Sequence, residues 1–64
     1  MAELRIESVM TRNPITVSGN TPLSEAQAIM ISRGLRHLPV IEDGKVVGVI
    51  SDRDILLAQL AHEG

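Results

Sequence analysis

The pattern of apolar and polar positions predicts two helices and three short strands. Residues 15–17 are β-branched throughout, which is typical of a strand. Thr21 and Pro22 mark the start of the first helix, with Thr21 as its N-cap and Pro22 in its first position. This helix is expected to reach about Arg33, because Gly34 can adopt the left-handed conformation that ends a helix.

A hairpin is predicted over residues 38–50, with Asp43 and Gly44 as a favoured two-residue turn. Counting outward from this turn gives three pairs: Ile41 with Val46, Val40 with Val47, and Pro39 with Gly48. Pro39 then lies at a non-hydrogen-bonded position, so that its missing N–H leaves the ladder intact.

The second helix is expected from Ser51 to about His62. Strand, helix, strand, strand and helix therefore follow one another in a single domain over residues 1–64, with its core over about residues 7–62. This order predicts an α+β fold in which a small three-stranded sheet packs on two helices.

The chain has more apolar surface than it can cover by itself. The first helix carries one apolar stripe, but the second is apolar round most of its circumference, and the strand over residues 46–50 is apolar on both faces. The apolar residues of the second helix are Ile55, Leu56, Leu57, Ala58, Leu60 and Ala61. Because 64 residues bury only a modest core, we expect a homodimer that pairs through the two helices.

Composition narrows the classes of function. Six basic and eight acidic residues give a formal net charge of −2, and the chain lacks Phe, Tyr and Trp, so nucleic-acid binding is not expected. Without cysteine, and with two histidines, no metal site is expected. No apolar stretch approaches the roughly 18 residues of a membrane span. The N-terminus also lacks the apolar core of a secretory signal, so we expect no membrane association and a cytoplasmic location.

The most informative turn is the one that contains Ser51 and Asp54, where a strand passes into a helix. Ser51 can accept from the N–H of the residue three positions on, so the two residues form a variant of the capping box. A junction of this kind also directs free N–H groups at one point, which favours phosphate, while a carboxylate beside it suits ribose hydroxyls. The turn alone is compatible with a simple helix cap or with a nucleotide site.

No catalytic residues are predicted. His37 lies at the start of a strand and His62 at the end of a helix, while Ser51 serves as a cap, so no nucleophile has an oriented base beside it. The five glycines do not form a phosphate-binding pattern. We therefore expect a protein that is not an enzyme.

Four segments in this order resemble the CBS domain, the cystathionine-beta-synthase motif. They are residues 9–17, 21–26, 36–44 and 48–54, and the last is similar to the family signature of glycine, two apolar residues, serine or threonine, two variable residues and aspartate. The resemblance covers about residues 7–60 and implies a β-α-β-β-α motif that pairs with a second motif. CBS motifs are usually found in tandem, whereas this chain holds one, so either two copies pair or the chain is a piece of a longer protein.

The resemblance also implies a site for an adenosine-containing nucleotide such as AMP, ADP, ATP or S-adenosylmethionine. Asp54 would accept from the ribose hydroxyls, Ser51 would lie near ribose or phosphate, and two apolar segments would line the adenine. The expected site residues are Pro14, Ile15, Thr16, Arg36, His37, Leu38, Pro39, Ser51, Arg53 and Asp54.

The expected function is that of a regulatory module that dimerises and senses such a nucleotide, with no cofactor required and an effector protein as a further candidate partner. The alternative is a dimerisation or protein-interaction module that binds no ligand.

Overall fold

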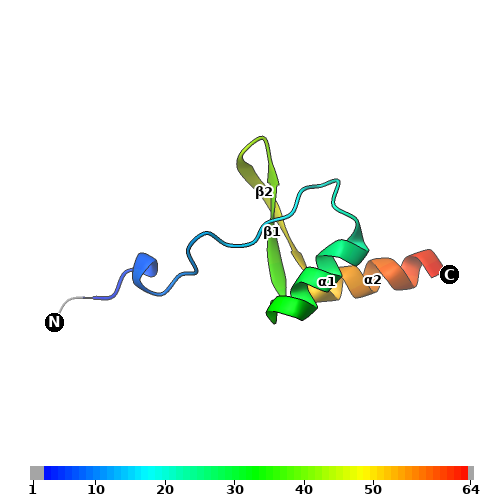
Figure 1. Cartoon of the computed structure of the whole chain (residues 1–64), viewed down its shortest axis with the longest axis horizontal. Helices are drawn as coiled ribbons and strands as arrows, with labels where there is room; N and C mark the ends of the chain where they lie inside the picture. The colour runs from blue at the N-terminus through cyan, green and yellow to red at the C-terminus, as the bar shows by residue number, and fades with distance from the viewer. Residues whose placement is uncertain (1–2, 64) are drawn as a thin grey trace.

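The computed structural model of the chain describes residues 3–63. Its elements follow in the order η1 (Ile6–Ser8), a short 3-10 turn, then helix α1 (Leu23–Arg33), strands β1 (His37–Glu42) and β2 (Lys45–Ser51), and helix α2 (Asp52–Glu63). Figure 1 shows the two helices beside each other at one end of the hairpin that β1 and β2 form. The fold is therefore α+β, as the sequence predicts.

Helix α1 begins at Leu23, and the expected N-cap at Thr21 is wrong. Pro22 takes the cap position, and its carbonyl accepts the N–H groups of Glu25 and Ala26. The hydroxyl of Thr21 instead accepts the N–H of Ser18 at 3.0 Å. Thr21 is therefore held in the turn before the helix, and its side chain is not available to the first helical N–H groups.

The end of α1 agrees with the sequence. Gly34 has φ 65° and ψ 33°, in the left-handed region that a residue without Cβ enters at little cost. The N–H groups of Gly34 and Leu35 both donate to the carbonyl of Met30, as is usual for this kind of helix end. This turn redirects the chain from α1 into β1.

The register predicted for the hairpin is confirmed only near its turn. Asp43 and Gly44 have φ values of 50° and 75°, which suit a tight hairpin, and Ile41 pairs with Val46 as expected. Beyond that pair the structure gives a corrected register: Val40 with Gly48, Pro39 with Val49, Leu38 with Ile50, and His37 with Ser51. Val47 is the extra residue of a β-bulge. Apolar residues on both faces of β2 do not favour one register over another, so the pattern gave no sign of the shift.

The expected strand over residues 15–17 is reduced to a single parallel bridge between Val17 and Val40. Val17 donates to the carbonyl of Pro39 at 3.0 Å and accepts from the N–H of Ile41 at 2.8 Å. The next bond of a parallel ladder would run from the N–H of residue 39 to the carbonyl of Ile15. Because proline has no N–H, that bond cannot form, and the ordered sheet has two strands rather than three.

A small core joins the sheet to the helices. Its buried side chains are Val17, Ala26, Met30, Leu38 and Ile55. They come from the bridge segment, α1, β1 and α2, whereas η1 and β2 contribute no buried residue. The opposite side of α2 is uncovered, with Leu56, Leu57 and Leu60 exposed over 54–58% of their surface. The surplus apolar surface expected for this helix is present.

Residues 3–13, which include η1, form an arm that stands away from the rest of the chain (Figure 1). The arm contributes much of the length of the molecule, whose extents are 55 × 25 × 18 Å. Within residues 3–63, no helix is long and apolar enough to cross a membrane.

Candidate functional site

The turn between β2 and α2 is a reciprocal capping box, as the sequence predicts. The N–H of Asp54 donates to Oγ of Ser51 at 3.0 Å, and the N–H of Ser51 donates to Oδ2 of Asp54 at 2.9 Å. Two N–H groups at the start of α2 are thereby satisfied without any other partner. The turn that carries the candidate ribose-binding aspartate is thus locked by its own local sequence.

The electrostatics of Asp54 follow from the same contacts. The backbone N–H of Ser51 and then the Ser51 side chain lower the pKa of this carboxyl below its ordinary value of 3.8, with a smaller contribution from His37. Oδ1 of Asp54 accepts no hydrogen bond from the part of the chain that the structure describes. Asp54 is therefore an exposed carboxylate that keeps one oxygen free to accept from a hydroxyl group.

His37 connects this turn to a cavity. It is the first residue of β1 and pairs with Ser51, the last residue of β2. The adjacent N–H of Asp52 donates to the carbonyl of Arg36 at 3.0 Å, which closes the junction between the sheet and α2. One side of His37 thus faces the capping box, and the residue also contributes to the cavity wall.

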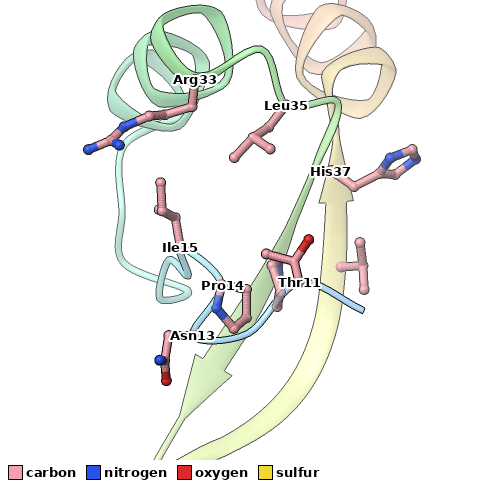
Figure 2. A pocket seen from close by; sticks show the side chains of 9 residues that line it. Thr11, Asn13, Pro14, Ile15, Arg33, Leu35 and His37 are labelled. Carbon is pink, nitrogen blue, oxygen red and sulfur yellow. The ribbon is translucent and has the colours of Figure 1, made fainter. Parts of the chain in front are cut away.

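The cavity lies where the base of the arm, the end of α1 and the hairpin meet. It has a volume of about 470 Å³, within the range of small-molecule sites. Its lining residues are Thr11, Asn13, Pro14, Ile15, Arg33, Leu35, His37, Pro39 and Val49. Figure 2 shows the side chains of Ile15 and Leu35 pointing toward each other, with Arg33 and His37 on opposite sides of them.

The lining residues are mostly apolar, and among them Arg33 carries the one permanent charge, with no carboxylate. Apolar walls with few polar groups suit a flat, weakly polar ring, and a guanidinium donates hydrogen bonds or stacks on such a ring. Within residues 3–63, no three His, Cys, Asp or Glu side chains gather into a metal site. The size and lining of the cavity are those that small-molecule sites use.

The structure brings together some of the expected site residues and separates others. Pro14, Ile15, His37 and Pro39 line the cavity. Ser51 and Asp54 form the capping box beside His37. The other four lie outside the cavity wall: Thr16, Arg36 and Arg53, which are exposed, and Leu38, whose side chain is fully buried in the core.

Five lining residues were missed by reasoning from the sequence: Thr11, Asn13, Arg33, Leu35 and Val49. Two of them carried a usable signal, because a helix that ends at Gly34 places its last residue, Arg33, and the next apolar residue, Leu35, on either side of the turn. Val49 enters the wall through its pairing with Pro39, which the expected register did not contain. Thr11 and Asn13 carried no comparable signal.

The family model of the CBS domain matches residues 6–61. Among curated relatives, the uncharacterized protein YtoI of Bacillus subtilis is 44% identical over 54 residues, or 83% of this chain and 12% of its own length. The inosine-5'-monophosphate dehydrogenase of Thermoplasma acidophilum is 37% identical over 51 residues, or 80% of this chain and 10% of its own.

Solved structures show the same fold. The CBS domain NE2398 superposes with a TM-score of 0.84 and 31% identity, over 91% of this chain and 46% of its own. CBSX2, solved in complex with AMP, superposes with a TM-score of 0.81 and 30% identity, over 88% of this chain and 42% of its own. The CBS domain pair of MJ0100 was solved with 5-methylthioadenosine and S-adenosyl-L-methionine. It superposes with a TM-score of 0.78 and 28% identity, over 92% of this chain and 48% of its own. The chain thus spans less than half of each of these solved chains, and about a tenth of the two curated relatives.

Proposed function

Because the chain belongs to the CBS domain family, whose members are regulatory modules, we propose that it binds an adenosine-containing nucleotide in the cavity beside the capping box. One observation carries the proposal: His37 lines an apolar cavity of about 470 Å³ and pairs with Ser51 of the box that presents Asp54. A site for a flat base and an acceptor for ribose hydroxyls are therefore adjacent. The ligands of CBSX2 and MJ0100, which are adenosine derivatives, support this choice of chemistry.

In this arrangement the base lies between Ile15 and Pro39, and the ribose lies at the His37 end of the cavity. Its hydroxyls donate to Oδ1 of Asp54, the oxygen that the capping box leaves free. Arg33, across the cavity from His37 in Figure 2, donates to the ring nitrogens of the base. A phosphate then extends past the start of α2, where Arg36 and Arg53 are exposed.

We also propose that two copies pair through their helices. Leu56, Leu57 and Leu60 form one exposed stripe along α2, and Ile31 is exposed on the neighbouring α1. Contact with a second copy across a two-fold axis would cover this stripe and Ile31 at once. The paired module would be cytoplasmic and would act on an effector rather than catalyse a reaction itself.

Calorimetric titration with AMP, ADP, ATP and S-adenosylmethionine tests the nucleotide proposal. We expect one of the four to bind and Asp54→Asn to weaken that binding at least about tenfold, since an anionic acceptor is lost. Asp52→Asn is the matched control. It removes the same charge two residues before Asp54 and leaves both capping hydrogen bonds in place.

Two results would count against it. Equal binding by wild type and Asp54→Asn would remove the ribose assignment. No binding of any of the four ligands by a protein that still forms dimers would favour the alternative of an interaction module without a ligand.

A further inference from the structure

The part of the cavity wall that residues 11–15 form has few contacts that fix its position. Thr11, Asn13 and Pro14 line the cavity but are exposed, whereas Ile15 packs against the core. Within residues 3–63, the hydrogen bonds of residues 3–16 all stay inside that segment. The position of this wall therefore depends on the residues that follow it along the chain.

Three hydrogen bonds attach residues 17–19 to β1. Val17 makes two of them with the backbone of the strand, at 3.0 and 2.8 Å. The third involves a side chain, because the N–H of Gly19 donates to Oε1 of Glu42 at 2.6 Å, across 23 positions of the sequence. Two bonds at one residue fix a point of attachment, and a further bond two residues away also fixes the direction of the chain through that point.

The contact explains why residue 19 is a glycine. A Cβ at Gly19 would lie 2.6 Å from Oε1 of Glu42, which is too close for both atoms to keep their places. The backbone itself does not require glycine here, since Gly19 is not among the residues with a left-handed φ. Glu42 also faces Lys45 across the hairpin turn, yet its carboxylate accepts from Gly19. Residue 19 is thus matched to the carboxylate of Glu42.

We infer that Glu42 is a positioning residue for the ligand of the cavity, an inference that rests on the proposed nucleotide site. Glu42 is the last residue of β1 and is not among the residues that line the cavity, so it acts without touching the ligand. Its carboxylate holds Gly19 through a charge-assisted hydrogen bond and so sets the course of residues 11–15. When this contact opens, the wall is displaced, and the apparent affinity falls with the fraction of molecules whose wall is in place.

Calorimetric titration of Glu42 variants tests the inference. Glu42→Ala removes the acceptor and is expected to raise the dissociation constant of the bound nucleotide at least about fivefold. Glu42→Gln removes the charge but keeps an oxygen that accepts from Gly19, so it is expected to bind nearly as well as wild type. All proteins are compared at a temperature at which circular dichroism shows them folded, so that a loss of stability does not appear as a loss of affinity.

A second variant breaks the same contact from the other side. Gly19→Ala adds a methyl group that displaces the carboxylate, and it is expected to weaken binding as much as Glu42→Ala does. Gly48→Ala is the matched control, because its added methyl group meets no atom within 4 Å. The double variant with alanine at both positions 19 and 42 should bind no more weakly than either single variant, since both remove one contact. Additive losses would contradict the inference.

Amide hydrogen exchange without ligand separates this inference from the proposed function. In Glu42→Ala the N–H groups of Val17 and Gly19 should exchange faster than in wild type, while that of Leu35, which donates to Met30 at the end of α1, should not change. Unchanged exchange at Val17 and Gly19, or faster exchange with unaltered nucleotide affinity, would overturn the inference. If wild type binds none of the four nucleotides, the proposed function fails, and the exchange alone decides whether Glu42 anchors the wall.

Discussion

The capping turn and the cavity lie side by side but are built in different ways. The turn is closed by two hydrogen bonds between Ser51 and Asp54, three positions apart in the sequence. The cavity is assembled from the arm, the end of α1 and both strands, and its walls belong together only because the core holds these segments. A local turn forms wherever its few residues allow it, whereas a cavity of this kind exists only in the complete fold.

Removing the side chain of Leu38 should have the largest effect, because it weakens the core on which both the capping turn and the cavity depend. Leu38 is fully buried between the cavity residues His37 and Pro39, and its loss leaves a hole in the core. We expect Leu38→Ala to lower the free energy of unfolding by about 2–5 kcal/mol, a large share of the stability of so small a domain. Urea unfolding followed by far-UV circular dichroism measures it, since the chain has no aromatic residue for fluorescence. Leu4→Ala, the same substitution at an exposed position, is the control and should change little.

Replacing Ser51 should affect the turn and spare the cavity. Ser51→Ala removes the oxygen that accepts the N–H of Asp54, and the loss of such a cap lowers the free energy of unfolding by about 1 kcal/mol. Ser24→Ala, in the first turn of α1 without a capping hydrogen bond, should be near neutral. A loss as large as that of Leu38→Ala would show that the turn is not the local unit that its hydrogen bonds indicate.

Acid should produce the smallest effect and confine it to the turn. The pKa of Asp54 is lowered in the folded chain, so its carboxylate stabilises the fold above its ordinary pKa of 3.8, and this contribution is lost as the pH falls through the lowered value. As the pH falls below 3.8, wild type should therefore lose stability more steeply than Asp54→Asn. Asp52→Asn should follow the wild-type slope, and parallel slopes for all three proteins would contradict the assignment.

The difference between local turns and segments brought together by the fold also decides what could be predicted from the sequence. The capping box, the left-handed Gly34 and the hairpin turn were predicted correctly, because each depends on residues within a few positions of one another. The register beyond Ile41 was wrong, since an unpaired Val47 is indistinguishable from its valine neighbours in the pattern. The third strand was overestimated because the N–H that Pro39 lacks is on the side of Ile15, away from the hairpin partner that sequence counting considers.

Five of the nine cavity residues were not predicted, although Arg33 and Leu35 carried a signal in the sequence. Pro14, Ile15, His37 and Pro39 were expected through the resemblance to CBS domains, and all four line the cavity. Arg33 was not expected, although it is the cation of the cavity wall. Its place depends on the angle at which α1 meets β1, which three-dimensional packing decides.

The bulge at Val47 has a consequence for the open edge of the sheet. β2 is an edge strand, and a straight edge with free N–H and carbonyl groups is a template on which further strands add without limit. A bulge breaks the even spacing of those groups and increases the local twist, so a second β2 cannot align along the whole edge. The exposed valines therefore lie along an edge whose backbone resists fibril-like growth.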